Sequence, residues 1–262
     1  MNFPRFLQIP IMASLALGFV GCSGPEQIKS AIEKDPTIVF QAIEKDPKGF
    51  MDAFEKAYRA AEQRKQEEEG SREKTRLEEE FKNPLKPKIS EDRVFFGNKA
   101  AKITIVEYSD FQCPYCSKAT LQSVHPILEA YPNDVRILFK HLPLDFHPKA
   151  MPAAKAYEAI AIQDPAKAIK FHDEVFKNQK DLNERGEAFI KEIAKKIGAD
   201  VKKMEKDMES ESVTKRIQED IAEAQEFRIS GTPGFIINGV SLRGAYPIQN
   251  FKEIIDRHLK PM

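Results

Sequence analysis

The hydrophobic residues of the chain follow three successive patterns, and each predicts a different kind of structure. The first is an apolar stretch at residues 7–20, interrupted only by Gln8 and Ser14 and preceded by Arg5. A helix that spans a bilayer needs about 20 residues, so this stretch is too short to cross a membrane comfortably. It is typical of the core of a cleaved signal peptide, which we place at residues 1–21.

The second pattern is an internal repeat with a period of 11 residues. The sequence AIEKDP occurs at 31–36 and again at 42–47, and a looser copy, AFEK, follows at 53–56. Because 11 residues make about three helical turns, equivalent apolar residues return to nearly the same helix face. In each Asp-Pro step, Asp can cap the next helix and Pro suits its first turn. Short helices are therefore predicted at about 26–34, 37–45 and 48–69.

These helices carry too many apolar residues for a free linker and too few for a self-sufficient domain. Such an apolar face needs a partner surface, either on further copies of the chain or on its own globular part. We favour self-association through residues 26–58, because identical chains offer identical faces. The apolar positions are Ile28, Ile32, Ile38, Val39, Phe40, Ile43, Phe50, Met51, Phe54 and Tyr58.

Residues 59–82 are dominated by charge, with EEE at 67–69 and again at 78–80 among scattered Lys and Arg. Opposite charges at helical spacing favour a solvated helix. We expect a solvated spacer that contacts no other part of the protein, with a break at Gly70-Ser71. The sequence NPLKP at 83–87 ends this segment and marks a domain boundary near residue 90.

The third pattern, from residue 91 onward, is that of a globular domain with strands and helices. Strands are predicted at 103–108 and 135–140, and a hairpin at 235–242 turns at Asn238-Gly239. Helices are predicted at 113–130, over most of 148–226 with breaks at Asp164-Pro165, Gly186 and Gly198, and at 247–259.

Composition limits the class of protein. Lys and Arg together number 41, as do Asp and Glu, so no net positive charge is available to offset nucleic-acid phosphates. Hydrophobic residues make up 41% of the 262, which is enough for a sizeable core and excludes a collagen-like or wholly disordered chain. Three cysteines are too few for a disulfide-dense scaffold.

The candidate chemistry lies at Cys113 and Cys116, which are separated by Pro114 and Tyr115. Two cysteines at this spacing can form a disulfide, hold half of a zinc site or stay buried and inert. Zinc would need two further ligands, and the five histidines show no ligand spacing, so we favour redox use without a metal. The pair opens a helix just after the strand that ends at Tyr108, where unpaired amide groups favour a thiolate. Cys113 is the expected nucleophile, with a lowered pKa, and Cys116 the resolving thiol.

The sequence FVGC at 19–22 resembles a bacterial lipobox, with a small residue directly before the cysteine. The resemblance implies cleavage before Cys22 and a diacylglycerol on its sulfur. The alternative is an ordinary signal peptide with an incidental cysteine. Under the lipoprotein interpretation, the protein lies in the bacterial cell envelope, faces the periplasm and is anchored to a membrane by lipid.

Three longer motifs occur in order: EYSDFQCPYC at 107–116, HLPLDFH at 141–147 and GTPGFIING at 231–239. Together they make residues 93–262 resemble the DsbA-like thiol–disulfide oxidoreductases of the thioredoxin superfamily. The resemblance implies an α/β thioredoxin fold with an inserted helical domain at about 148–226. The expected organisation is a signal peptide at 1–21, a helical extension and charged linker at 22–90, and the thioredoxin domain at 91–262.

The resemblance also implies chemical roles. Cys113 matches the exposed nucleophile of a redox disulfide, and Cys116 matches its resolving partner. Glu107 matches a buried acid that assists proton transfer at the resolving cysteine. Neither a cofactor nor a metal is implied.

Substrate binding is implied at the same place. Pro233 matches a cis-proline that faces the cysteine pair and exposes the backbone of Thr232 to an extended client segment. Pro114 and Tyr115 join the substrate-binding residues and tune the redox potential. Tyr115 stands where the best-known oxidases have His, so the oxidising strength is left open.

The N-terminal extension resembles that of ScsC-like members of this group, in which it joins protomers and the enzyme shuffles disulfides. We therefore expect an exported enzyme that forms or shuffles disulfides in client proteins, with a membrane redox partner and a homo-oligomer formed through residues 26–58. One alternative is an isomerase or reductase kept reduced by that partner. Another is a non-catalytic, thioredoxin-like binding lipoprotein.

Overall fold

The computed structural model describes residues 24–260, so the predicted signal peptide and Cys22 lie outside the described residues. The chain divides into two compact units, with the boundary between Glu69 and Gly70. We call the described residues before this boundary the N-terminal unit and those after it the C-terminal unit. Within residues 24–260, no helix is both long enough and apolar enough to cross a membrane.

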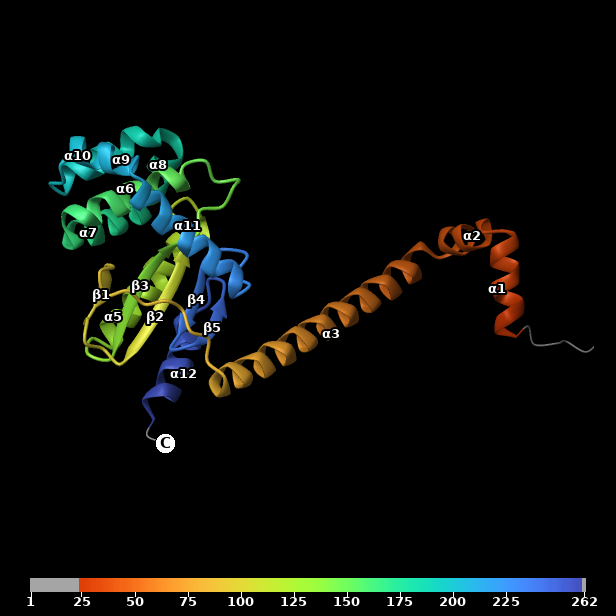
Figure 1. Ribbon diagram of the computed structural model, residues 1–262. Helices are drawn as coiled ribbons and strands as arrows, with labels where there is room; N and C mark the ends of the chain where they lie inside the picture. Colours follow the sequence, from red (N-terminus) through yellow and green to blue (C-terminus); the bar gives the residue numbers. More distant parts are fainter. Residues whose placement is uncertain (1–23, 261–262) are drawn as a thin grey trace, which may run out of the picture. The chain divides into compact units, whose positions relative to one another are not determined.

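The N-terminal unit is helical and has no buried residue among its described positions. It contains α1 (Pro25–Lys34), α2 (Thr37–Lys45) and the first part of α3 (Pro47–Lys82), so the predicted short helices are confirmed (Figure 1). The Asp-Pro steps act as predicted: Asp35 accepts a hydrogen bond from the amide of Thr37 at 3.0 Å, and Asp46 accepts one from Gly49 at 2.9 Å. The exposed large apolar residues are Ile28, Ile32, Ile38, Val39, Phe40, Phe50, Met51, Phe54 and Tyr58.

Helix α3 runs for 36 residues without interruption, so the expected break at Gly70-Ser71 is wrong. One glycine inside a helix costs only about 1 kcal/mol relative to alanine. The Glu, Lys and Arg residues on either side favour the helix and form pairs one turn apart, such as Arg76 with Glu80. A single unfavourable position does not end a helix so well supported by its neighbours.

The last turns of α3 are not the partner-free spacer predicted from their charge. Glu80 is only 8% exposed, and its carboxylate accepts hydrogen bonds from the backbone amide and the hydroxyl of Ser241, at 2.6 and 2.9 Å. The Arg76 guanidinium donates to the Ser241 carbonyl at 2.9 Å. Together, Glu80 and Arg76 occupy the donor and the acceptor of an edge strand, groups that a neighbouring strand would otherwise pair.

A second set of contacts extends this packing. Arg257 forms a bidentate ion pair with Glu78, at 2.6 and 2.8 Å, and lies 3.7 Å above the ring of Phe81. Tyr246 donates its hydroxyl hydrogen to Glu73 at 3.1 Å. The charges of this segment therefore hold it against the rest of the C-terminal unit instead of keeping it in solvent.

The C-terminal unit is built on a five-stranded sheet with the order β1-β3-β2-β4-β5. Strands β2 and β3 are parallel, and the other neighbours are antiparallel. The β4–β5 hairpin turns at Asn238 and Gly239 as predicted, and both have positive φ. Strand β1 was not predicted, because three residues are too few to show an alternation of apolar and polar side chains. The bounds are β1 Phe95–Gly97, β2 Ile103–Ser109, β3 Val135–His141, β4 Gly234–Ile237 and β5 Val240–Arg243.

The predicted helix at 113–130 is present but changes pitch. It consists of α4 (Pro114–Ala119), a π-helical segment (Thr120–Val124) and α5 (His125–Ala130). Pro126 has no amide hydrogen to donate, and the His125 amide donates to the carbonyl of Thr120, five residues back.

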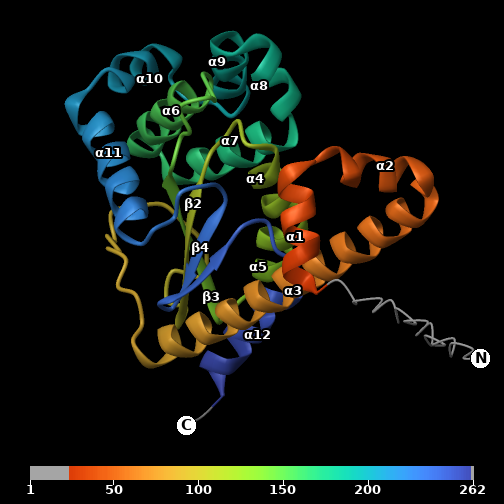
Figure 2. The ribbon, with the colours of Figure 1, turned by 90° about the vertical axis from the view of Figure 1, so that its right-hand side faces the viewer.

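Six helices form the insertion, which spans 150–226 and agrees with the predicted 148–226. It gathers at one end of the sheet (Figures 1 and 2). The predicted breaks are confirmed: Asp164 caps a helix by accepting from Ala166 at 2.8 Å, and Gly186 and Gly198 have positive φ. The helices are α6 (Ala150–Gln163), α7 (Pro165–Lys177), α8 (Gln179–Arg185), α9 (Glu187–Lys196), α10 (Val201–Met208) and α11 (Glu211–Glu226), and α12 (Ile248–Leu259) closes the chain.

Aromatic rings join the insertion to the sheet. The Phe111 ring lies 5.2 Å from Phe139 of β3 and 5.1 Å from Phe176 of α7, measured between ring centroids. All three side chains are buried, and Tyr157 of α6 packs against the same group. Because Phe111 lies two residues before Cys113, this cluster fixes the position of the cysteine loop.

Candidate active site

The sheet topology brings three loops to one edge. Strands β2 and β3 are parallel, so the loops after Ser109 and after His141 leave from the same edge. Strand β4 is antiparallel to β2, so the residues just before Gly234 lie there too. The cysteine loop with α4, the 142–149 loop and the segment at Thr232-Pro233 therefore converge.

The cysteine pair lies at the start of α4. Cys113 is the residue before the helix, and its carbonyl accepts hydrogen bonds from the amides of Cys116 and Ser117, at 3.1 and 3.2 Å. Both cysteines are free thiols. Cys113 is the more accessible of the two, although only 3% of its surface is exposed, and Cys116 is fully covered. The nucleophile expected from the resemblance is thus less exposed than implied.

The Thr232-Pro233 peptide bond is cis, as the resemblance implied, and it faces this pair. The Cys113 thiol donates a hydrogen bond to the Thr232 carbonyl, with 3.4 Å between sulfur and oxygen. The Pro233 carbonyl accepts a hydrogen bond from the amide of Gly244 at 2.9 Å, which fixes the loop from its other side. Tyr115 extends into solvent with 63% of its surface exposed.

The surroundings separate the pKa values of the two thiols. A hydrogen bond from the Cys116 side chain lowers the pKa of Cys113 to about 6, and interactions with Thr232 and with the amides of Tyr115 and Cys116 outweigh the opposing effect of burial. Burial raises the pKa of Cys116, and so does its hydrogen bond to the Cys113 sulfur. The site therefore favours a thiolate at Cys113 and a neutral thiol at Cys116.

Glu107 lies on β2, six residues before Cys113, and is completely buried. Burial raises its pKa to about 7, although Ser109 and His125 act in the opposite direction. Its negative charge is one of the causes that raise the pKa of Cys116, so the two groups lie close enough to interact. A carboxyl with this pKa can both accept and release a proton near neutral pH.

Two residues that the sequence analysis did not single out also contact the cysteine pair and its loop. The amide of Asp110 donates to the Cys116 sulfur at 3.4 Å. The Gln179 side-chain amide donates to the carbonyls of Phe111 and Cys113, at 2.9 and 2.8 Å. Asp110 lies inside the quoted motif EYSDFQCPYC, so its closeness to the cysteines in the sequence could have singled it out. Gln179 belongs to α8, and no local pattern connects it to the cysteines.

Two histidines that are separated in the sequence meet in the fold. His125 and His172 each lie within hydrogen-bond distance of one Asp173 oxygen, at 3.1 and 3.0 Å, and these three donor atoms are within 4.8 Å of one another. Burial alone would raise the pKa of Asp173, but the two hydrogen bonds hold it below its usual range. Of the described residues, these three form the group that is able to ligate a metal.

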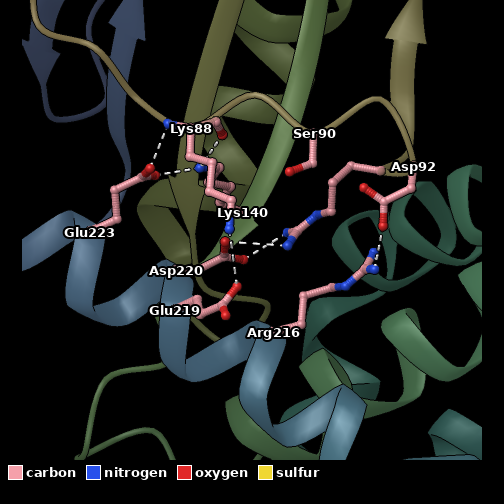
Figure 3. Close-up of a pocket in the computed structure, with 9 residues that line it drawn as sticks. Lys88, Ser90, Asp92, Lys140, Arg216, Glu219, Asp220 and Glu223 are labelled. Atoms are coloured by element: carbon pink, nitrogen blue, oxygen red, sulfur yellow. Dashed lines mark hydrogen bonds and ion pairs between the residues drawn. The ribbon is translucent and has the colours of Figure 1, made fainter.

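A separate pocket of about 160 Å³ lies between α11 and the segment that precedes β1 (Figure 3). Its charged side chains are paired: Arg93 with Asp220 at 2.7 Å, Arg216 with Asp92 at 2.6 Å, and Lys140 with Glu223. Because these charges balance one another, the cluster ties the 88–93 segment to α11 and β3 and offers no net charge to a ligand.

The sequence pattern of the family described as Thioredoxin matches residues 89–257, which is more than half of the chain. The chain belongs to the thioredoxin family. Together with the fold, this confirms the predicted membership of the thioredoxin superfamily.

Solved structures support the same fold. A thioredoxin-like oxidoreductase from Silicibacter pomeroyi is 27% identical with a TM-score of 0.58, and the match covers 66% of this chain and 95% of that one. BdbD from Bacillus subtilis, in its oxidised form, is 22% identical with a TM-score of 0.62, and the match covers 68% of this chain and 98% of BdbD. The catalytic domain of Proteus mirabilis ScsC is 23% identical with a TM-score of 0.57, and the match covers 71% of this chain and 97% of that domain.

The curated relatives match this chain over only a small part of their own length. A Na⁺/H⁺ antiporter, NhaA 3 of Salinispora tropica, is 35% identical over 154 residues, which is 58% of this chain and 22% of the antiporter. This chain therefore spans only about a fifth of that relative. The match supports shared ancestry of one segment and carries over no transport activity.

Proposed function

We propose that the protein is a thiol–disulfide oxidoreductase that forms or shuffles disulfides in client polypeptides through Cys113 and Cys116. The observation that carries the proposal is geometric: two free thiols at the start of α4 face a cis-proline, and the carbonyl before that proline lies 3.4 Å from the Cys113 sulfur. The opposite shifts of the two thiol pKa values agree with this arrangement. Family membership and the oxidoreductase from Silicibacter pomeroyi agree with this activity.

In the oxidising direction, a client thiolate attacks the Cys113 sulfur of the disulfide. The bond between Cys113 and Cys116 breaks, and Cys116 leaves with the electron pair and takes up a proton. A second client thiolate then attacks the client sulfur of the mixed disulfide and displaces the Cys113 thiolate. Two electrons pass from the client dithiol to the enzyme, and the low pKa of Cys113 makes it a good leaving group.

In the reducing or isomerising direction, the Cys113 thiolate attacks a client disulfide and releases one client thiolate. In reduction, the Cys116 thiolate then attacks the Cys113 sulfur and displaces the second client thiolate, which leaves a disulfide between Cys113 and Cys116. Cys116 must lose its proton in that step. Glu107, with a pKa of about 7, is the proposed acceptor, and burial makes it basic enough for this role. The Thr232 backbone and the exposed Tyr115 ring would contact the client chain beside the reacting sulfurs.

Insulin reduction and refolding of scrambled ribonuclease test the activity and its direction. A Cys113→Ala variant is expected to lose at least about a thousandfold in rate in both assays, because the nucleophile is absent. Strong ribonuclease refolding assigns isomerase activity, and rapid oxidation of reduced ribonuclease assigns oxidase activity. If the wild-type protein is inactive in all three assays, the proposal fails in favour of a non-catalytic binding lipoprotein.

Export and anchoring are proposed from the sequence of residues 1–22. The lipobox-like FVGC would place a lipid on Cys22 and hold the domain at the periplasmic side of the envelope, within reach of a membrane redox partner. A processed Cys22→Ala protein is expected in the soluble fraction of fractionated cells. Its unchanged recovery with membranes would remove the lipid anchor from the proposal.

Self-association is proposed for residues 26–58 within the extension at 22–90. Its support is the exposed apolar row of the N-terminal unit, which includes Ile32 and Phe54. Light scattering on the protein that begins at Ser23 is expected to show an oligomer. The double variant Ile32→Asp, Phe54→Asp is expected to be a monomer. The exposed Gln41→Asp is the matched control. A monomeric parent protein would contradict the proposal.

A further inference from the structure

The cluster of His125, His172 and Asp173 has no part in the disulfide exchange described above. His125 is the first residue of α5, whereas His172 and Asp173 lie on α7 of the insertion. His125 and Asp173 are 48 residues apart in the sequence, which therefore shows no ligand spacing. Only the packing of α7 beside α5 brings the three side chains together.

The three donor atoms converge on one point. Oδ1 of Asp173 lies 3.1 Å from Nε2 of His125 and 3.0 Å from Nδ1 of His172, and the three donor atoms are all within 4.8 Å of one another. In a tetrahedral zinc site with ligands about 2.0–2.2 Å from the ion, neighbouring donor atoms are about 3.3 Å apart. Two of the three separations are already close to that value, and a small rotation of the partly exposed His125 ring would adjust the third.

Aromatic packing fixes the orientation of His172. Its side chain is buried, and three phenylalanine rings surround it with centroids 4.6, 4.7 and 4.8 Å from its own: Phe96, Phe139 and Phe176. Within the described part of the chain, its Nε2 atom has no hydrogen-bond partner, whereas Nδ1 faces the carboxylate of Asp173. The rings thus hold Nδ1 toward the other two donors, and a ligand held in place beforehand loses little freedom on binding.

The other two members of the cluster reach solvent. The side chains of His125 and Asp173 are 26% and 29% exposed, so an ion can enter from this side and water can reach it. The ion pairs found for Asp173 among the described residues are with the two histidines. No lysine or arginine of this part of the chain therefore competes with a cation for the carboxylate.

We propose that His125, His172 and Asp173 bind a zinc ion, with water in the fourth position. Two imidazoles and a carboxylate suit zinc, whereas calcium and magnesium take oxygen ligands. Each imidazole would use the nitrogen that now faces Asp173. The ion would join α7 of the insertion to α5, which continues the helix that starts at the cysteine pair. Because this site exists only in the folded chain, zinc would stabilise the fold.

Isothermal titration with zinc chloride tests the site in the protein that begins at Ser23, prepared without a polyhistidine tag. The cysteine pair is first oxidised to the disulfide, so that no thiolate is available to bind zinc. We expect one zinc ion per chain and a rise in melting temperature of about 5–10 °C with zinc a hundredfold above its dissociation constant. No binding at micromolar to millimolar zinc chloride overturns the proposal.

His125→Ala and Asp173→Ala are each expected to weaken zinc binding at least about a hundredfold, because each removes a ligand. Both side chains are partly exposed, so both variants should fold, and their melting temperatures without zinc check this. Glu129→Ala is the matched control, since Glu129 is exposed on the same helix as His125 but is outside the cluster. It should bind zinc like the wild type. Equal weakening in all three variants would indicate attraction by surface charge and overturn the site.

X-ray absorption at the zinc edge identifies the ligands in the loaded wild-type protein. Nitrogen and oxygen neighbours at about 2.0–2.2 Å are expected, with the scattering pattern of two imidazole rings. A spectrum with fewer than two imidazoles would place the ion elsewhere on the protein and overturn the assignment.

Discussion

The N-terminal and C-terminal units are built from similar helices but are stabilised in different ways. The described part of the N-terminal unit has no buried residue, and its phenylalanines face solvent. In the C-terminal unit, helices of the same amphipathic kind cover a sheet and bury a continuous core. Local capping and repeats therefore suffice to specify helices, whereas a core needs surfaces brought together from distant parts of the chain.

The sharpest test of this difference compares two phenylalanines. Phe251 of α12 is fully buried and lies 4.8 Å from the Phe235 ring, whereas Phe54 of α3 is exposed. Phe251→Ala is expected to lower the free energy of unfolding by about 3–5 kcal/mol, and Phe54→Ala by less than about 0.5 kcal/mol. Urea unfolding at low protein concentration measures both. A large loss with Phe54→Ala would show that the N-terminal unit unfolds together with the core.

Glu107 gives a second test of the C-terminal unit, because it is a buried group that lowers the stability of the core, whereas Phe251 raises it. Its pKa is about 7 when folded, against an ordinary value near 4.5, so folding favours the protonated form. The carboxyl therefore costs nothing at low pH, and its cost grows as pH rises from about 4.5 to about 7. Glu107→Gln should stabilise the protein by about 3 kcal/mol at pH 8 and by little at pH 4.

The same variant should slow the step in which Cys116 resolves the mixed disulfide. Urea unfolding at both pH values, with trapping of the mixed disulfide by acid, measures the two effects. Equal stabilisation at pH 4 and pH 8 would contradict the raised pKa of Glu107.

Two glutamates of α3 test where the boundary between the units lies. Glu80 accepts two hydrogen bonds from Ser241 in β5, whereas Glu69 is exposed. Glu80→Ala should cost about 1–3 kcal/mol, because the Ser241 amide is left unpaired at a buried edge. Glu69→Ala should change the free energy of unfolding by less than about 0.5 kcal/mol. Similar values for both variants would mean that the end of α3 does not stabilise the sheet.

Cys113 predicts a pH dependence of the stability of the reduced form relative to the oxidised form. The pKa of Cys113 is lowered to about 6 in the folded dithiol, and the thiolate has no counterpart in the disulfide. The stabilisation is lost as pH falls through about 6 and is complete above the ordinary thiol pKa. The difference in melting temperature between the two forms should therefore move in favour of the reduced form between pH 6 and 9.

The geometry of the candidate site follows from the sequence where the contacts are local. Cys113 and Cys116 lie on one helical turn and lower and raise each other's pKa values, and Glu107 lies on the strand just before them. The cis bond before Pro233 was expected only because the motif GTPGFIING resembles that of a known family. The expectation failed for α3, because a charge run looks the same whether it is solvated or paired with a distant surface.

The sequence by itself determined the elements: the capped helices of the repeat, the two long central strands, the Asn238-Gly239 turn and the cysteine pair at a helix start. Each follows from residues within a few positions of one another. Only the tertiary structure decided that Glu80 covers the β5 edge, that Gln179 holds the cysteine loop and that Asp110 joins this loop to the 142–149 loop. A polar side chain is equally compatible with water and with a buried partner, and the choice depends on which distant backbone group the folded sheet and helices bring within hydrogen-bond distance.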